Sequence, residues 1–366
     1  MKQSGRLHNL DYLRGLAASG IMIYHYSMWT NGHADIDSFI CRVGVYGVSI
    51  FYVLSGLTLF VVYQDRMAPS FVDLKDFFKK RVLRIFPLLW LATLATILLP
   101  GAKMNLRELI LNLSGLFGFV AWDEYIALGS WSIGNELVFY VFFPLFVLTT
   151  KRSIWSFWLI IAAIISFFVY YSFYAIDDGQ LLRGQWKNYV NPLNQVYLFL
   201  GGYIIGWATQ KIKFQSWLSL GLIACGFLLF AFYPLFISHP TSEAFGQNSI
   251  VHATMLKENT VHLVAGWNRI VFSICCLLVC LGFYKLTIEL PKILHHPLSF
   301  LGEASYSVYL LHPIIYTWLF WFSANYYIMP KNVLLLFSVA ATLILSYFVY
   351  HYFEKVFMKL GRKKTA

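Results

Sequence analysis

The chain alternates long apolar stretches with short polar connections from residue 10 to residue 353. A helix that crosses a bilayer needs about 20 mostly apolar residues, and ten stretches come close to this length. An eleventh stretch, Leu106–Ala121, is shorter and contains glycine, so we expect a re-entrant or interfacial segment there. The pattern predicts ten transmembrane helices, at Leu10–Thr30, Gly44–Tyr63, Val82–Leu99, Ser132–Thr149, Ile154–Ala175, Leu193–Gln210, Trp217–Ile237, Trp267–Leu286, Phe300–Phe322 and Val333–Phe353.

The composition also indicates an integral membrane protein. Apolar residues make up 59% of the 366 residues and charged residues 12%, which is about half the charged share of a soluble domain. No segment between or after the apolar stretches is long enough for a soluble domain. We therefore predict an all-α integral membrane protein, a bundle of about ten transmembrane helices that forms one domain over residues 1–366.

The positive charge of the chain predicts its orientation. The formal net charge is +11, and cytoplasmic loops of membrane proteins collect Lys and Arg. With ten spans, 19 of the 28 Lys and Arg residues fall on the side of the termini and 8 on the other side. This predicts that both termini are cytoplasmic, and it explains the charge without a nucleic-acid partner.

Cysteine and histidine positions predict no metal site. Four of the five cysteines lie inside apolar stretches, and no CxxC pair occurs. The longest outer connection, Ser238–Gly266, carries His239, His252 and His262, but scattered loop histidines are usually solvated. We expect neither a metal nor a permanently bound cofactor.

Two ionisable side chains interrupt the first apolar stretch. Arg14 and His25 are eleven residues apart, which returns the helix to nearly the same face after a rise of about 16 Å. Both side chains are therefore expected to point into one groove at different depths, with Asp11 one turn before Arg14 as its partner. The alternative is that Arg14 reaches the cytoplasmic headgroups and His25 is a hydrogen-bonded packing residue.

Polar side chains recur in two other stretches. Ionisable groups inside a span are costly and usually mark function. Such groups on three helices predict a polar chamber within the bundle, and chance scatter is the alternative. The residues concerned are Trp131, Ser132 and Glu136 in the fourth stretch and Ser305, Tyr309 and His312 in the ninth.

The connection 66–84 carries the densest basic cluster, which includes Lys80, Arg81 and Arg84. Such a cluster could bind an anionic headgroup, a nucleotide or a phosphorylated cofactor. Alternatively, it only fixes the topology of the third span.

Five segments follow one another in a fixed order: LDYLRGLAA from Leu10 with a histidine at His25, GVSIFYVLSG from Gly47, RVLRIFP from Arg81, WSIGNEL from Trp131 and ASYSVYLLHP from Ala304. Together they resemble the signature of the acyltransferase family 3 membrane proteins. Each motif is weak alone, but five in order are specific. The departures are small, namely Tyr52 for a family Phe and Ile133 for a Leu.

The resemblance implies an enzyme of a bacterial inner membrane. It would move an acyl group, usually acetyl, from cytoplasmic acyl-CoA to a hydroxyl of a cell-surface glycan or lipid-linked saccharide. Some relatives carry a fused extracytoplasmic domain, and we expect this chain to be of the stand-alone type.

A mechanism can be assigned to the residues on this basis. Neutral His25 would act as general base, and Arg14 would contact the donor or stabilise developing negative charge. Arg81 and Arg84, with Lys80, would hold the phosphates of CoA, and Glu136 would orient His25 or bind acceptor hydroxyls. Tyr309 and His312 would line the pocket together with Asp11, Trp131, Ser132 and Ser305. A covalent acyl-serine route through Ser132 or Ser305 is less favoured.

Two other classes of function use the same features. A transporter or flippase for a lipid-linked saccharide could also need a basic mouth and a polar chamber, although no internal repeat is evident. The third hypothesis is a structural partner of a glycan synthase, and such a protein would tolerate replacement of Arg14 and His25. Consumption of a thioester by the purified protein separates the enzyme from both.

Overall fold

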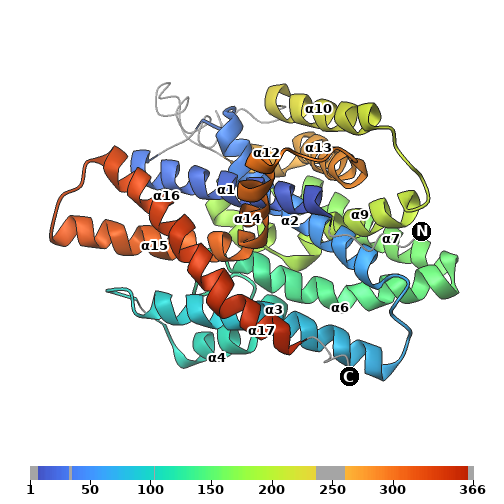
Figure 1. The fold of residues 1–366 in the computed structure, drawn as a ribbon, viewed down its shortest axis with the longest axis horizontal. Helices are drawn as coiled ribbons and strands as arrows, with labels where there is room; N and C mark the ends of the chain where they lie inside the picture. Colours follow the sequence, from blue (N-terminus) through green and yellow to red (C-terminus); the bar gives the residue numbers. More distant parts are fainter. Residues whose placement is uncertain (1–6, 33–34, 103, 236–259, 362–366) are drawn as a thin grey trace.

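The computed structural model describes residues 7–32, 35–102, 104–235 and 260–361, and within these ranges all regular secondary structure is helical (Figure 1). Shorter helices connect the long ones: α4 (Leu106–Ser114), α5 (Phe117–Val120), η1 (Tyr171–Ala175), η2 (Leu182–Gln185), α8 (Trp186–Tyr189), α12 (Val261–Val264), α14 (Lys292–Glu303), η3 (Val349–Glu354) and α17 (Lys355–Leu360). The long helices are α1 (His8–Asn31), α2 (Phe39–Tyr63), α3 (Phe71–Ile97), α6 (Trp131–Arg152), α7 (Ile154–Tyr170), α9 (Pro192–Thr209), α10 (Ser216–Phe232), α13 (Gly266–Lys285), α15 (Ser305–Asn325) and α16 (Lys331–Phe348).

The predicted helical class is confirmed. Each of the ten predicted stretches overlaps one of the long helices. Within the described ranges, five helices are long and apolar enough to cross a bilayer, namely Phe39–Tyr63, Trp131–Arg152, Ile154–Ala175, Gly266–Lys285 and Lys331–Leu360. The number of about ten spans stays a prediction.

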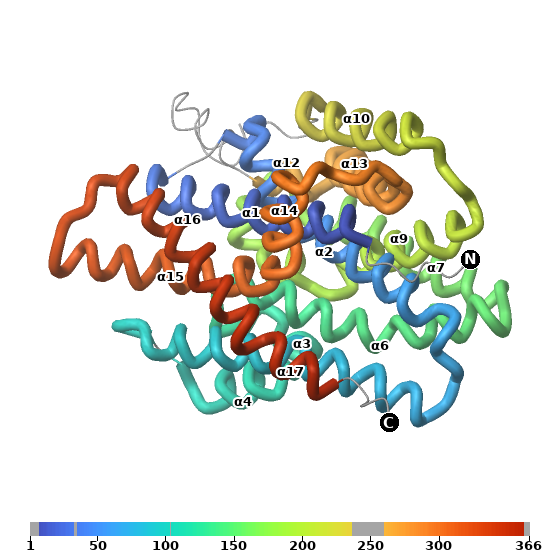
Figure 2. Tube along the Cα trace, viewed as in Figure 1, coloured from blue at the N-terminus to red at the C-terminus, as the bar shows by residue number. Residues whose placement is uncertain are grey.

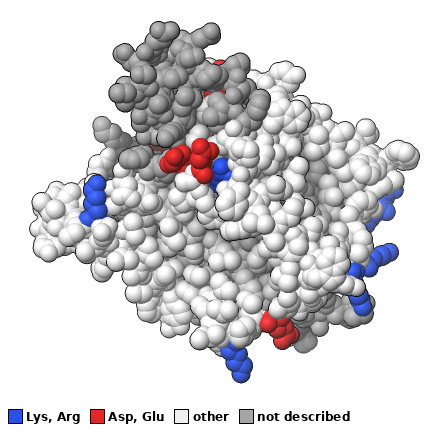
Figure 3. All heavy atoms as spheres, turned by 90° about the horizontal axis from the view of Figure 1, so that it is seen from above, with Lys and Arg blue, Asp and Glu red and all other residues white. Residues whose placement is uncertain are grey.

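The outer surface of the bundle is rich in large apolar side chains. In α7, Trp155 is 78% exposed and Leu159 71% exposed. Figure 3 shows one face of the molecule on which most residues are neither acidic nor basic and the charged side chains are few. An apolar surface of this extent suits contact with lipid and not with water.

The connections between long helices gather at two opposite ends of the bundle. In Figures 1 and 2, the α2–α3, α6–α7 and α9–α10 connections lie at the right-hand end, and the α3–α4 and α15–α16 connections lie at the left-hand end. The α2–α3 and α9–α10 connections contain Arg66 and Lys211, and helix α6 ends with Lys151 and Arg152. The helices therefore alternate in direction, as the predicted sidedness requires.

Helices α2 and α9 approach each other closely because glycine lies at their contact. A Cβ on Gly56 would lie 2.0 Å from the carbonyl oxygen of Phe199, and one on Gly202 would lie 1.9 Å from that of Val53. Small residues allow helix backbones in membrane proteins to pack at this range. The pair forms the centre of the bundle, against which α1, α6 and α13 pack.

Two predicted boundaries are wrong. Helix α3 begins at Phe71 and not at residue 82, because the Ser70 side chain caps it by accepting a hydrogen bond from the Asp73 N–H. The basic residues 79–84 therefore lie on a helix and not in a connection. The predicted Phe300–Phe322 span is divided at Ala304, where α14 ends and α15 begins. A Cβ on Gly302 would lie 2.2 Å from the Asp11 carbonyl oxygen, so α14 lies directly against α1 at this break.

The predicted re-entrant or interfacial segment corresponds to the short helices α4 and α5. Helix α4 has nine residues and a length of about 13 Å. Its N-terminus is stabilised by a capping box between Asn105 and Glu108. Trp90 of α3 donates a hydrogen bond to the Leu113 carbonyl at 2.7 Å. Neither helix is long enough to cross a bilayer.

His239 and His252 of the predicted outer connection lie outside the described residues. The last two positions of the predicted Trp217–Ile237 span also lie outside them. The remaining histidine of that connection, His262, is described and is buried in α12. Burial lowers the pKa of His262, so its imidazole is neutral at pH 7.

Candidate functional site

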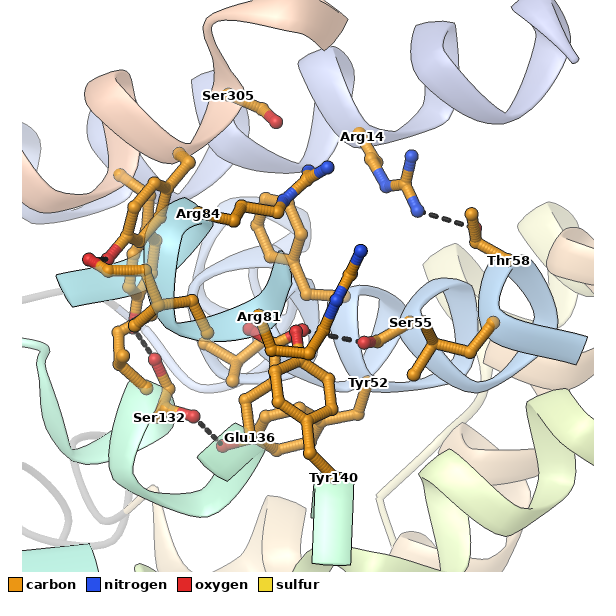
Figure 4. Close-up of a pocket in the computed structure, with 17 residues that line it drawn as sticks. Arg14, Tyr52, Ser55, Thr58, Arg81, Arg84, Ser132, Glu136, Tyr140 and Ser305 are labelled. Carbon is orange, nitrogen blue, oxygen red and sulfur yellow. Dashed lines mark hydrogen bonds between the residues drawn. The ribbon is translucent and has the colours of Figure 1, made fainter. Parts of the chain in front are cut away.

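Five helices enclose a cavity of about 100 Å³ lined by three arginines. Arg14 comes from α1, and Arg81 and Arg84 come from α3. Figure 4 shows their guanidinium groups pointing into the same space, next to side chains of α2 and α6. We call this space the arginine cavity. Its other lining residues include Val48, Phe51, Tyr52, Ser55, Thr58, Ser132, Glu136, Tyr140, Ser305, Tyr306 and Tyr309.

Arg14 is held by neighbours on its own helix and on α2. It forms the predicted ion pair with Asp11, at 3.3 Å. It also donates to the Thr58 hydroxyl at 2.5 Å and to the Leu54 carbonyl at 3.3 Å. These contacts direct the guanidinium into the bundle. The prediction that Arg14 points inward is therefore confirmed, and the headgroup alternative does not apply to this conformation.

The arginines of α3 carry charge that no described carboxylate neutralises by direct contact. The Arg81 guanidinium lies over the rings of Tyr63 and Tyr140, 5.9 and 5.7 Å from their centroids. Neither Arg81 nor Arg84 forms an ion pair with a carboxylate in the described ranges. Cations in this state are suited to binding an anionic ligand.

Lys80, which was predicted to act with them, is placed differently. Its ammonium pairs with Asp76 at 2.6 Å, one turn earlier on α3, and it does not line the arginine cavity. The charge of Lys80 is thus paired within α3, and the side chain takes no part in lining the cavity that Arg81 and Arg84 share.

Glu136 supplies the single acidic group in the lining of the arginine cavity. It accepts a hydrogen bond from the Ser55 hydroxyl at 2.6 Å. Three arginines and one glutamate give this lining a formal charge of +2. The structure thus places Glu136 in the arginine cavity and gives His25 a different partner, so the prediction that Glu136 orients His25 is wrong.

A second cavity, of about 230 Å³, surrounds His25. We call it the aromatic cavity because its wall includes three tryptophans and four tyrosines, namely Trp29, Trp131, Trp186, Tyr24, Tyr125, Tyr189 and Tyr309. Tyr125 lies in the connection before α6, and burial raises its pKa. Its hydroxyl is therefore protonated and accepts a hydrogen bond from the Trp186 ring N–H at 3.1 Å.

His25 contacts two other rings in this cavity, those of His312 and Trp29. Its Nδ1 is 2.9 Å from Nε2 of His312. The Trp29 ring is stacked on it, with centroids 5.0 Å apart and planes at 5°. Arg14 and His25 line two neighbouring cavities that share Val48 and Tyr309 as lining residues, and the prediction of one groove with the two side chains at different depths stays a prediction.

Tyr309 is fixed at this boundary by hydrogen bonds to the start of α6. Its hydroxyl donates to the Gly129 carbonyl at 3.0 Å and accepts from Ser132 at 2.9 Å. Gly129 has a φ of +85°, a conformation that favours glycine. Ser132 lines the arginine cavity and Gly129 lines the aromatic cavity, so Tyr309 is part of the wall between them.

Ten of the twelve predicted site residues line one or both cavities, and Asp11 and Lys80 line neither. Arg14, Arg81, Arg84, Ser132, Glu136 and Ser305 line the arginine cavity, while His25, Trp131 and His312 line the aromatic cavity, and Tyr309 lines both. The α2 residues Tyr52, Ser55 and Thr58 were not predicted as site residues. Their spacing of three places them on one face of α2, and this spacing was the available signal.

Comparison with known proteins identifies the family. The family 3 model, described as an acyltransferase domain, matches residues 7–351. The "Putative acetyltransferase" of Acidianus two-tailed virus is 26% identical over 314 residues, which cover 82% of this chain and 80% of the viral protein. No solved structure matches the chain.

Two bacterial relatives also match. The "Putative O-acetyltransferase" of Staphylococcus aureus strain COL is 24% identical over 99% of this chain, which spans 59% of the length of that relative. The "Putative peptidoglycan O-acetyltransferase" of Bacillus subtilis strain 168 is 27% identical over 159 residues, or 38% of this chain and 23% of the relative. With the family model matched over almost its whole length, the chain belongs to the acyltransferase family 3.

Proposed function

We propose that the protein is a membrane O-acyltransferase that moves an acyl group, most simply acetyl, from acyl-CoA to a hydroxyl of a saccharide. Family membership and the names of the relatives support acyl transfer to oxygen. The observation that carries the proposal is that a cavity with three arginines shares a wall with an aromatic cavity containing His25. A transfer reaction needs such neighbouring sites for two chemically different substrates.

The arginine cavity is the proposed donor site. CoA carries several phosphates, and guanidinium groups bind phosphate through paired, charge-assisted hydrogen bonds. Arg81 and Arg84 are free of direct carboxylate partners in the described ranges and would hold the phosphates. A cavity of about 100 Å³ holds only one end of CoA. The thin arm with the thioester would extend from it towards Val48 and Tyr309.

The aromatic cavity is the proposed acceptor site. Ligand pockets combine aromatic walls with a few placed polar groups, and a sugar ring presents apolar C–H faces and polar edges. Tryptophans on the cavity wall would contact those faces, and the imidazole of His25 would meet a hydroxyl at the edge. The B. subtilis relative is named for peptidoglycan, and we extend to this chain only the saccharide class.

The chemistry then needs one proton carrier. Nε2 of His25 accepts the proton of the acceptor hydroxyl while the hydroxyl oxygen bonds to the thioester carbonyl carbon. The C–S bond breaks as the tetrahedral intermediate collapses, and the thiolate of CoA takes the proton back from His25. A positioned general base contributes about 10²- to 10⁴-fold in rate. Arg14 would stabilise the oxyanion or the adjacent part of the donor.

The direct test is thioester consumption by detergent-purified protein. We expect release of free CoA from acetyl-CoA, increased by added cell-envelope saccharide, and about a 10²- to 10⁴-fold loss in His25→Ala. His296→Ala is the matched control, because His296 lies exposed on α14 and lines neither cavity. A monodisperse His25→Ala protein with the wild-type rate would refute the base assignment. A wild-type protein that consumes no thioester would favour saccharide transport instead.

A further inference from the structure

His312 is buried, with 1% of its surface exposed, and both of its ring nitrogens have partners. Nδ1 lies 3.1 Å from the carbonyl oxygen of Val308, one turn earlier on α15. Nε2 lies 2.9 Å from Nδ1 of His25. The two imidazoles are nearly parallel, with planes at 13°.

These contacts determine where the protons are. A carbonyl oxygen can only accept a hydrogen bond, so Nδ1 of His312 must be the donor to Val308. A neutral imidazole carries one proton, so Nε2 of His312 is then an acceptor. The hydrogen bond between the two rings therefore takes its proton from Nδ1 of His25. Nε2 of His25 is left with a free lone pair, and no described residue forms a hydrogen bond with it.

The surroundings of His312 keep this arrangement in place. The Tyr26 hydroxyl donates to the His312 carbonyl at 2.9 Å and contacts the Thr342 hydroxyl at 2.6 Å, which ties α15 to α1 and α16. The Trp29 ring is stacked over the imidazoles of both histidines. Pro313 follows His312 and has no N–H, so the Tyr309 carbonyl one turn earlier lacks its usual helical donor. If Nδ1 of His312 were unprotonated, its lone pair would face the carbonyl oxygens of this turn, which is unfavourable.

We infer that His312 is a positioning residue that fixes the tautomer of His25, so that Nε2 of His25 is the nitrogen that accepts the acceptor proton. The inference rests on the proposed function for the reaction, but the tautomer itself is a property of the protein without substrate. An imidazole whose Nδ1–H is held by a partner presents Nε2 as a base. The free ring would exchange between tautomers and point in more than one direction.

The first arm of the test measures the tautomer. In protein labelled with ¹⁵N-histidine, nuclear magnetic resonance distinguishes protonated from unprotonated ring nitrogens, and comparison with His25→Ala assigns the signals. We expect His25 to carry its proton on Nδ1 and to present an unprotonated Nε2. In His312→Leu the signal of His25 should change towards Nε2–H. A wild-type His25 with its proton on Nε2 would overturn the inference, whatever the activity.

The second arm measures rate. His312→Leu removes the acceptor and should lower thioester turnover by about 10- to 100-fold, the same order as the loss of a partner that orients a metal-binding histidine. His312→Gln retains a side-chain carbonyl that can accept the Nδ1–H bond and should restore most of the rate. Equal losses in both variants, with thermal unfolding unchanged, would contradict a positioning role. If the tautomer is as inferred but His25→Ala remains fully active, His312 still fixes the tautomer of His25, but the assignment of Nε2 as the proton acceptor is overturned. If the wild-type protein consumes no thioester, the proposed function fails and the tautomer measurement alone decides the inference.

Discussion

The two cavities differ in almost every property except the wall between them. The arginine cavity has three cations and a formal charge of +2 in a volume of about 100 Å³. The aromatic cavity is larger, at about 230 Å³, and its described lining has no Lys, Arg, Asp or Glu. A single site for one ligand would not need both chemistries. The contrast supports the proposed division into a donor site for an anion and an acceptor site for a neutral ring with hydroxyls.

The side chains that the two cavities share determine how a group could pass between them. Val48 and Tyr309 line both cavities, and the Phe51 ring packs edge-on against Tyr309 with centroids 5.8 Å apart. A group carried from one cavity to the other must pass these side chains. Changes confined to one cavity should therefore affect one substrate, and changes to the wall should affect both.

Apart from the histidine variants, the largest expected effect is on the binding of the acyl donor. Arg84→Ala removes a cation that is free of direct ion pairing in the described ranges. A charge-assisted hydrogen bond is worth about 1.5–3 kcal/mol, so we expect acetyl-CoA binding to weaken by about 10- to 100-fold. Isothermal titration measures it. The control is Arg107→Ala, since Arg107 is 62% exposed and outside the cavity; an equal loss in both variants would mean a nonspecific charge effect.

The next effect concerns the wall. Tyr309→Ala should join the cavities, so that water from the aromatic cavity reaches the thioester. We expect hydrolysis of acetyl-CoA without acceptor to rise by about tenfold, which is about 1.4 kcal/mol in the barrier, while transfer to saccharide falls. The control is Tyr316→Ala on the same helix, because Tyr316 is also buried but lines neither cavity. A fall in both rates for Tyr309→Ala would leave no role for a dividing wall.

A smaller effect is expected on the acceptor. Trp186→Ala removes an aromatic surface of the aromatic cavity and should raise KM for the saccharide several-fold with donor binding unchanged. Acetylation of cell-envelope saccharide at varied acceptor concentration provides the measurement. Trp158→Ala serves as the matched variant, because Trp158 is 52% exposed on α7 and lines neither cavity. A change in donor binding for Trp186→Ala would contradict the division of substrates.

The smallest expected effect is a gain in donor binding, whereas the changes above cause losses or leakage. Glu136→Gln keeps an oxygen for the Ser55 hydroxyl but raises the formal charge of the arginine cavity. We expect acetyl-CoA to bind a few-fold more tightly, most clearly at low salt, where charge interactions are least screened. Titration at two ionic strengths measures this. A collapse of turnover with unchanged binding would instead give Glu136 a part in proton transfer.

The sequence predicted the helices, and ten of its twelve candidate site residues line a cavity, but it did not predict how they are grouped. The separation of eleven residues along an ideal helix places Arg14 and His25 on similar faces. Which neighbour each side chain meets depends on α2 and α15, whose positions follow from glycine contacts and from the break at Ala304. The hydrogen bond between His25 and His312 joins residues 287 positions apart. No local pattern in the sequence reveals such a contact.

Local signals were available for two of the differences. Ser70, three residues before Asp73, is a helix-capping position, and it predicts the early start of α3 that places Arg81 and Arg84 on a helix. Asp76 and Lys80 have the spacing of an ion pair along a helix, and the structure shows this pair. Both signals concern residues close in sequence, and only such contacts can be derived without the fold.

We assign donor binding to the arginine cavity and the chemical step to His25. Thermal unfolding of the purified protein with and without acetyl-CoA tests this assignment most directly, because a ligand that binds only the folded state raises its stability. The account predicts a clear rise in Tm for the wild type and for His25→Ala, and no rise for Arg81→Ala. A rise that persists in Arg81→Ala and is lost in His25→Ala would contradict the division between the cavities.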